Sequence, residues 1–189
     1  FPGTISISAN AMLQLVSEIG EQVAEMGFKR LIFFNAHGGQ IGLLQTIARQ
    51  LRVKCPSMAV LPCFLWNGVD SLEGLIPDKE VEEGLHAALA ETSLMMYLNP
   101  ELVGSERPID GINEQFLESE QSFKSAPKGW SLEGAAPCAW LTQDLSESGV
   151  IGDSSSSNYE LGKNIEKVLV DHWVELFLAL MKSNWPPVQ

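Results

Sequence analysis

Residues 31–40, LIFFNAHGGQ, decide how this chain can fold. The four apolar residues at the start form a short hydrophobic run, which is typical of a buried strand in a parallel sheet. An Asn-Ala-His-Gly-Gly turn follows at once and leads into a helical pattern. A strand that passes through a glycine-rich turn into a helix is half of a βαβ unit. The stretch therefore predicts an α/β fold.

His37 stands just beyond the carboxyl end of the predicted strand, where ligands bind in open α/β sheets. Gly38 and Gly39 permit a tight turn and a close approach of the backbone, so we expect them to contact the substrate. We predict a functional role for His37; the alternative is a hydrogen-bonded structural histidine. The turn does not match a phosphate-binding loop, because it lacks the spacing of the glycine-rich nucleotide motifs and a following Lys.

Helical and strand patterns alternate around this stretch. Helices are predicted over residues 9–26, 41–51 and 160–182, and a second strand over residues 58–65. This alternation implies parallel strands joined by right-handed crossovers, with helices covering the sheet. The buried stripe of the first helix is predicted to hold Leu13, Val16, Ile19, Val23 and Met26. That of the last helix is predicted to hold Leu161, Ile165, Val168, Leu169, His172, Leu176 and Leu180.

A second informative region covers residues 78–99, DKEVEEGLHAALAETSLMMYLN, which we predict to be helical. On one regular helix, His86 and Glu91 would diverge by about 140°. They converge only if His86 precedes the first turn and Glu91 lies one turn in, and Gly84 permits such a break. Trp66 follows the second predicted strand, where it either lines a substrate pocket or covers the core as a rim residue.

The composition indicates a single globular domain over residues 1–189. Hydrophobic residues make up 45% of the chain and charged residues 19%. The net charge of −12 disfavours nucleic acid and anionic membranes as partners. There is no apolar run long enough to span a membrane and no signal-peptide pattern. The 3 cysteines, Cys55, Cys63 and Cys138, lack metal-site spacing, so we expect reduced thiols in a cytoplasmic protein.

Four stretches together resemble the creatininase family of metal-dependent amidohydrolases, in the family's order. They are FPGTIS at residues 1–6, NAHGGQ at 35–40, HAALAETS at 86–93 and GVIGD at 149–153. The resemblance implies a three-layer α/β/α sandwich with a mainly parallel sheet. It further implies a site for two metal ions, zinc or manganese, and a homo-oligomer that is often a hexamer. The implied reaction is hydrolysis of the C–N bond of a small amide such as creatinine or a formamide.

By position in these motifs, His37 and Glu91 would be metal ligands, and His86 would be the catalytic acid/base or a substrate contact. Imidazole and carboxylate are suitable ligands for zinc and manganese. The metals would lower the pKa of a bridging water and polarise the amide carbonyl, and His86 could protonate the leaving nitrogen. Gln40 and Ala88 stand where the family pattern has Asn and Gly, which bears on the shape of the pocket.

The family pattern places a Glu-x-His-Gly-x-His motif and then an Asp upstream of the Phe-Pro-Gly-Thr stretch, and this sequence starts after them. We therefore expect it to be the C-terminal portion of a longer family domain, with an exposed strand edge or a partner covering that edge. Two other functions stay open. One is a non-catalytic binding or assembly subunit with the same fold, and the other is a flavodoxin-like phosphate binder that uses Gly38 and Gly39.

Overall fold

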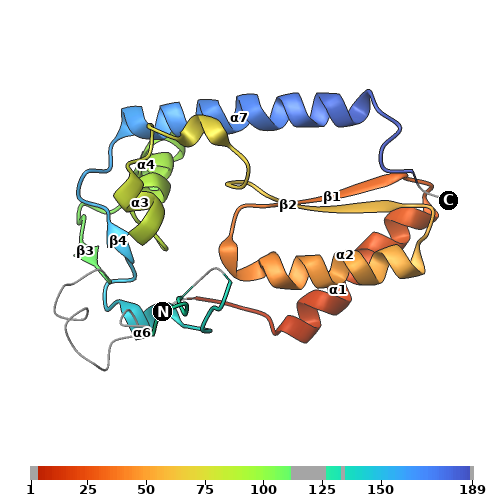
Figure 1. Ribbon diagram of the computed structural model, residues 1–189, viewed down its shortest axis with the longest axis horizontal. Coiled ribbons are helices and arrows are strands. Elements are labelled where there is room, and N and C mark those ends of the chain that lie inside the picture. The colour runs from red at the N-terminus through yellow and green to blue at the C-terminus, as the bar shows by residue number, and fades with distance from the viewer. Residues whose placement is uncertain (1–3, 112–126, 133–134, 188–189) are drawn as a thin grey trace. The chain divides into compact units, whose positions relative to one another are not determined.

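The computed structural model describes residues 4–111, 127–132 and 135–187 (Figure 1). The first three residues of the Phe-Pro-Gly-Thr stretch lie outside the described residues. The described chain forms two compact units. We call Asp70–Val170 the helical unit, and the chain up to Val69 together with the chain from Asp171 onward the sheet unit. The single domain expected from the sequence stays a prediction, and each unit is described by itself.

The sheet unit contains the helix–strand–helix–strand order that the sequence predicts. Its elements are α1 (Ala9–Glu25), β1 (Arg30–Asn35), the short η1 (Gly38–Gln40), α2 (Ile41–Lys54) and β2 (Ala59–Phe64). The strands β1 and β2 are parallel, with Ile32 opposite Leu61. Helix α1 begins after Ser8, whose hydroxyl accepts the N–H of Ala11, as expected of an N-cap. The helix is followed by Gly27, which has a φ of 90° that suits the residue after a helix.

One face of β1 and β2 packs on α2 and α1. Leu44, Ile47 and Leu51 of α2 form a buried core cluster. Half-buried side chains of α1 and the strands pack against this cluster, among them Met12, Leu13, Val16, Leu31, Phe33 and Val60. Each fully buried aliphatic side chain contributes about 1.5–3 kcal/mol, so this cluster stabilises the packing of α2 against α1 and the strands.

The buried stripe predicted for α1 is partly wrong. Ile19 is 54% exposed and Met26 is 69% exposed, whereas Ser17 and Gly20 are buried. The reason is close helix packing, since a Cβ atom at Gly20 would lie 2.4 Å from a methyl carbon of Leu51. Helix α1 therefore meets α2 through its small residues, and this rotates the larger side chains of the predicted stripe toward solvent.

The other face of the strands packs on α7 (Tyr159–Met181), through the part of that helix that belongs to the sheet unit. The ring of Phe34 lies 4.9 Å from that of Trp173 and 5.5 Å from that of Phe177, both edge to face. Successive strand residues face opposite sides, so helices cover both faces of β1 and β2 (Figure 1). This three-layer arrangement confirms the predicted α/β fold. Leu176 is 45% exposed, however, and the buried Trp173 occupies the stripe instead.

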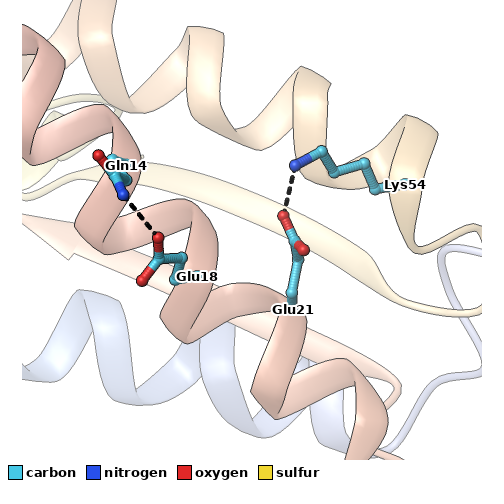
Figure 2. Close-up of polar contacts among 4 residues, drawn as sticks. All are labelled: Gln14, Glu18, Glu21 and Lys54. Carbon is cyan, nitrogen blue, oxygen red and sulfur yellow. Dashed lines mark hydrogen bonds and ion pairs between the residues drawn. The ribbon is translucent and has the colours of Figure 1, made fainter.

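An ion pair on the surface joins α1 to α2, and a second polar contact lies within α1 (Figure 2). The ammonium group of Lys54 lies 2.5 Å from a carboxylate oxygen of Glu21, and Gln14 donates to Glu18 one turn along α1. The hydrogen bond and the charge of Glu21 raise the pKa of Lys54. Because the pair is exposed to solvent, it adds little to the stability of the sheet unit.

Strand β2 has an edge that cannot pair continuously. The N–H groups of Ala59 and Leu65 donate to carbonyl groups on the β1 side, at 2.9 and 2.8 Å. Because alternate residues of a strand point their backbone groups to the same side, the nitrogen of Pro62 faces away from β1. Pro62 has no N–H, so the outer edge of β2 is interrupted there. Strand β1 has no such interruption, because none of its residues is a proline; the exposed strand edge, or a partner that covers it, stays a prediction.

The helical unit contains short elements and the first part of α7. They are η2 (Asp70–Leu72), α3 (Asp78–Glu83), α4 (Leu89–Leu98), η3 (Pro100–Leu102), β3 (Ile109–Asp110), α6 (Thr142–Leu145) and β4 (Gly152–Asp153). The helix predicted over residues 78–99 is broken at residues 84–88, between α3 and α4. This break places His86 before α4 and Glu91 in its first turn, which is the arrangement that their convergence requires.

Helix α4 packs closely on the first part of α7. A Cβ atom at Gly162 would lie 1.8 Å from the carbonyl oxygen of Ser93, so only glycine fits there. Ser93 is fully buried, and its hydroxyl accepts the N–H of Asn158 at 3.1 Å, just before α7 begins. Ser93, the last residue of the predicted motif, thus joins the two helices. None of the helices in the described ranges is long and apolar enough to cross a membrane.

Candidate functional site

The turn after β1 holds His37 by its backbone. The side chain of Asn35 donates to the carbonyl oxygen of His37 at 2.7 Å and accepts the N–H of His37 at 3.2 Å. His37 itself is exposed and extended, and it directly precedes η1. The same Asn thus fixes both backbone groups of His37 and leaves the imidazole at the surface of the sheet unit.

Gly39 makes room for the ring of His37. A Cβ atom at Gly39 would lie 2.9 Å from Nε2 of His37, whereas a Cβ atom at Gly38 would meet nothing within 4 Å. Gly39 therefore leaves the space that the imidazole of His37 occupies. The predicted contacts of Gly38 and Gly39 with a substrate stay predictions. The side-chain oxygen of Gln40 is buried without a hydrogen-bond partner among the described residues. Such an acceptor suits a donor group from a ligand or a water.

A cavity of about 230 Å³ lies at the carboxyl ends of β1 and β2, within the sheet unit. Its lining includes Asn35, Cys63, Asn67 and Trp173. Burial raises the pKa of the Cys63 thiol, which disfavours the reactive thiolate. Trp66, which we predicted as a substrate contact, is half-buried in the turn after β2 and is not among the lining residues. The aromatic wall comes from Trp173, whose indole N–H donates to the carbonyl of Leu65 at 2.8 Å.

His86 is fixed by the chain around residues 149–151, within the helical unit. Its ring nitrogen Nδ1 lies 2.5 Å from the carbonyl oxygen of Gly149. Because a carbonyl can only accept, Nδ1 carries the proton, and Nε2 is the basic nitrogen of the neutral ring. The backbone of His86 also pairs with that of Ile151, which is fully buried. Both the orientation and the tautomer of the imidazole are thus set by this segment.

Glu91 and Thr92 hold the residue that follows His86. Ala87 has a φ of 50°, the left-handed conformation that a residue with a side chain rarely adopts. The carboxylate of Glu91 accepts the N–H of Ala87 at 2.7 Å, and the hydroxyl of Thr92 donates to its carbonyl at 2.7 Å. The His-Ala-x-x-x-Glu-Thr spacing therefore has a local physical purpose, since the first turn of α4 clamps the strained residue.

Glu80 reaches α4 from α3. One of its carboxylate oxygens accepts the N–H of Ala90 at 2.9 Å, in the first turn of α4. Burial raises the pKa of Glu80, the N–H of Ala90 lowers it, and the nearby charges of Asp153 and Glu91 raise it further. The net direction is upward. Glu80 thus acts as an acceptor at the start of α4, a role that its sequence position in α3 does not reveal.

Asp110 anchors the loop that leads to Gly149. Its carboxylate accepts hydrogen bonds from the hydroxyl groups of Ser146 and Ser148 at 2.8 and 2.7 Å. The backbone N–H of Gly111 donates to the other oxygen at 2.7 Å. Partial burial pushes the pKa of Asp110 upward, but these hydrogen bonds outweigh it and lower the pKa from 3.8 to about 2.

The predicted site residues fall into two groups. His86 and Glu91 lie together in the helical unit, joined through Ala87, whereas His37, Gly38, Gly39 and Trp66 belong to the sheet unit. The structure adds Asp110, Glu80 and Trp173, which the sequence patterns did not single out. The only signal for Asp110 was the Asp-Gly turn, and the serine-rich loop that surrounds it carries no motif.

The donor groups of the described residues do not by themselves complete a metal site. An exposed imidazole such as that of His37 is a suitable ligand type, but structural zinc sites need four ligands and catalytic ones three. Across residues 4–111, 127–132 and 135–187, no group of three or more His, Cys, Asp or Glu side chains could hold a metal ion. We therefore derive no chemical step through a metal.

Comparison with known proteins finds relatives that are named as mycofactocin precursor peptide peptidases. The chain is 29% identical over 187 residues to the mycofactocin precursor peptide peptidase of Mycobacterium ulcerans (strain Agy99). That alignment covers 99% of this chain and 61% of the relative, so the chain spans about three-fifths of the relative's length.

Solved structures of similar fold include two creatininase variants. One is complexed with creatine and has a TM-score of 0.65 at 21% identity. The match covers 99% of this chain and 69% of the creatininase chain. Another, of Zn–Zn type, has a TM-score of 0.63 at 20% identity. This match covers 99% of this chain and 68% of the creatininase chain. At this identity the likeness shows the fold alone.

The family profile described as "Creatininase: Creatinine amidohydrolase" matches residues 1–177, which is most of the chain. The match includes both the His37 turn and the His86–Glu91 segment. This chain belongs to the creatininase family.

Proposed function

We propose that this chain is part of a hydrolase that cleaves an amide C–N bond, with His86 as the catalytic acid/base. The observation that carries the proposal is the 2.5 Å contact between Nδ1 of His86 and the carbonyl oxygen of Gly149. A histidine held in this tautomer presents Nε2 as a base of fixed direction. Membership of a family described as creatinine amidohydrolase supports the reaction class.

The proposed chemistry needs one proton carrier. Nε2 of His86 accepts a proton as water attacks the amide carbonyl, and then donates it to the nitrogen of the leaving amine. Positioned acid–base groups of this kind contribute roughly 10²–10⁴-fold to rates. The clamp of Glu91 and Thr92 on Ala87 supports the same role, because it fixes the backbone next to the imidazole.

We propose a peptide amide as the first substrate class to test, and a small amide such as creatinine as the second. The relative at 29% identity is named as a precursor peptide peptidase, whereas the creatininase structures are only 20–21% identical. Both substrate classes present the same bond to His86. A short peptide library and creatinine, assayed side by side for release of amine or of creatine, separate the two.

The decisive variant is His86→Gln, and His172→Gln is its matched control. His172 lies on α7, outside the helical unit, and its ring stacks edge to face on Trp173. We expect His86→Gln to lower kcat/KM by roughly 10²-fold or more, while His172→Gln retains activity close to wild type. Equal activity of the two variants would remove His86 from the mechanism.

We also propose that His37 and Glu91 each serve as a ligand to a divalent ion, zinc or manganese, with the remaining ligands supplied from outside the described residues. The Zn–Zn type of a creatininase structure supports this. Elemental analysis of the purified chain, of His37→Ala and of Glu91→Gln tests each ligand separately. Metal that is retained in both variants would exclude these residues as ligands.

The alternative is a non-catalytic subunit of the same fold, which binds or assembles without turning over an amide. If this alternative holds, the wild-type chain does not hydrolyse amides. His86→Gln then changes the stability of the chain only by the loss of one hydrogen bond. We further propose that the chain acts as a homo-oligomer, which light scattering after size-exclusion chromatography measures directly.

A further inference from the structure

A continuous series of hydrogen bonds runs from Asp110 to the ring of His86. The hydroxyl of Ser146 donates to the carboxylate of Asp110 at 2.8 Å and accepts the N–H of Gly149 at 2.9 Å. The carbonyl oxygen of the same Gly149 accepts the proton on Nδ1 of His86. One serine therefore connects the carboxylate to the residue that sets the tautomer of the histidine.

The rest of the loop is held by the same carboxylate oxygen. The backbone N–H groups of Glu147 and Ser148 donate to it at 3.1 and 2.9 Å, and the hydroxyl of Ser148 donates at 2.7 Å. That hydroxyl also accepts the N–H of Val150 at 3.2 Å. Asp110 thus organises a loop that, without it, would leave several serine and amide donors without an acceptor.

Asp110 itself is placed by backbone pairing. In the antiparallel pair of β3 and β4, Asp110 lies opposite Gly152. A Cβ atom at Gly111 would lie 3.0 Å from a methyl carbon of the buried Ile151, so the two strands are in close contact. The strand that carries Asp110 therefore lies directly beside the segment whose backbone pairs with His86.

We propose that Asp110 is a positioning residue for His86, which acts through Ser146 and the carbonyl of Gly149 to keep the imidazole proton on Nδ1. Asp110 does not touch the reacting bond in this role. Its carboxylate fixes the loop, the loop fixes the carbonyl, and the carbonyl selects the tautomer that leaves Nε2 basic. The effect on rate rests on the proposed function of His86, but the effect on the tautomer does not.

The test is the tautomer of His86, measured by two-dimensional NMR of the full chain labelled with ¹⁵N-histidine. The chain has only 3 histidines, and His86→Gln assigns the signal. The spectra are recorded over a series of pH values, and the tautomer is read where the ring signals no longer change with pH. We expect the wild type to carry the proton on Nδ1 and Asp110→Leu to populate the Nε2-protonated form.

Two further variants separate positioning from simple loss of structure. Asp110→Asn keeps an acceptor for the serine hydroxyls, so it should retain more of the wild-type tautomer than Asp110→Leu. Asp144→Asn is the matched control, since Asp144 also accepts a backbone N–H, that of Leu141 at 2.7 Å, but belongs to none of the hydrogen bonds between Asp110 and residues 146–149. It should leave the tautomer of His86 unchanged. If Asp110→Leu does not fold, Ser146→Ala breaks the same series and should shift the tautomer.

Kinetics complete the test. If the proposed function holds, Asp110→Leu lowers kcat about tenfold or more with little change in KM, and Asp110→Asn restores part of the loss. A folded Asp110→Leu or Ser146→Ala chain with the wild-type tautomer would overturn the positioning role. A shifted tautomer together with a fully active His86→Gln would instead keep the positioning role and overturn the proposed function.

Discussion

The carboxylate of Glu91 lies 2.7 Å from the backbone nitrogen of Ala87, the residue next to His86. This contact gives Glu91 a structural role, whatever ligand its other oxygen binds. Its loss should release the strained backbone of Ala87. The two roles can be separated because an amide side chain retains the acceptor and loses the charge.

We expect Glu91→Ala to destabilise the chain by about 1–2 kcal/mol, since it removes an acceptor at the start of α4. Glu91→Gln should stay within about 0.5 kcal/mol of wild type because its amide oxygen still accepts the N–H of Ala87. Urea unfolding monitored by circular dichroism measures both. Glu82→Ala, an exposed glutamate of α3, is the control. Equal losses for the Ala and Gln variants would contradict the clamp.

Replacement of Ala87 by Gly should stabilise the chain, or at least not destabilise it. An L-residue in the left-handed conformation costs roughly 1–2 kcal/mol, which exceeds the entropic cost of glycine of roughly 0.5–1 kcal/mol. The same substitution at Ala11, an exposed position within α1, should cost about 1 kcal/mol. Opposite signs for the two variants in thermal unfolding are the expected result. A loss at both sites would mean that Ala87 carries no strain.

Gly152→Ala should be strongly destabilising, by about 2 kcal/mol or more. Gly152 has a φ of 131°, and a Cβ atom there would lie 2.6 Å from that of Ala88 and 2.9 Å from Cα of Gly84. Gly42→Ala in α2 is the control, because a Cβ atom there meets nothing within 4 Å. It should add roughly 0.5–1 kcal/mol of stability. Unfolding by denaturant compares the two, and a neutral Gly152→Ala would show that β4 can shift.

Stability should depend on pH through Asp110. Its pKa in the folded chain is lowered from 3.8 to about 2, so its contribution is present above pH 3.8 and is lost as the pH falls toward about 2. After allowance for solvent screening, we expect this contribution to be about 1–2 kcal/mol. To isolate this contribution, the free energy of unfolding is measured for the wild type and for Asp110→Asn from neutral pH to pH 2. The difference between the two chains should narrow over that window, and a constant difference would be the contrary result.

Glu80 should show the opposite dependence. Its pKa is raised in the folded chain, so protonation favours folding below the unfolded pKa, and this benefit is lost as the pH rises through the folded pKa. Glu80→Gln retains an acceptor for the N–H of Ala90 and removes the partly buried charge. We expect the variant to be at least as stable as wild type at pH 7, with the difference shrinking below the unfolded pKa. A large loss at pH 7 would show that the charge itself is required.

Local patterns predicted the parts of this structure that local chemistry controls. Ser8 and Gly27 delimit α1 because a cap needs a side-chain acceptor at one end and a left-handed residue at the other. The break at Gly84 was anticipated as the condition for His86 and Glu91 to meet. The strand and turn around His37 were also predicted from local sequence, because an apolar run followed by two glycines is typical of a buried strand that ends in a tight turn.

Local sequence patterns could not predict contacts between segments that are far apart in the sequence. Trp173 lies 108 positions from Leu65, to which it donates its hydrogen bond, and nothing in the helical period of α7 favours it over Leu176. Asp110 meets Ser148 from 38 positions away, and the serine-rich loop has no period at all. Such pairings depend on how strands and helices come together. The GVIGD stretch at residues 149–153 was therefore identified in the sequence, but its contacts with His86 and the anchoring of the preceding loop by Asp110 were not.

Pro62 also determines at which edge of the two-stranded sheet a further strand can be added. An incoming strand that meets β2 finds a missing donor in the middle of the ladder, whereas at β1 the outward-facing groups of Arg30, Ile32 and Phe34 follow without a gap. Strand addition, including the kind that starts aggregation when a chain is concentrated, should therefore begin at β1. A proline placed at Ile32 would make the sheet resistant to self-association from both sides.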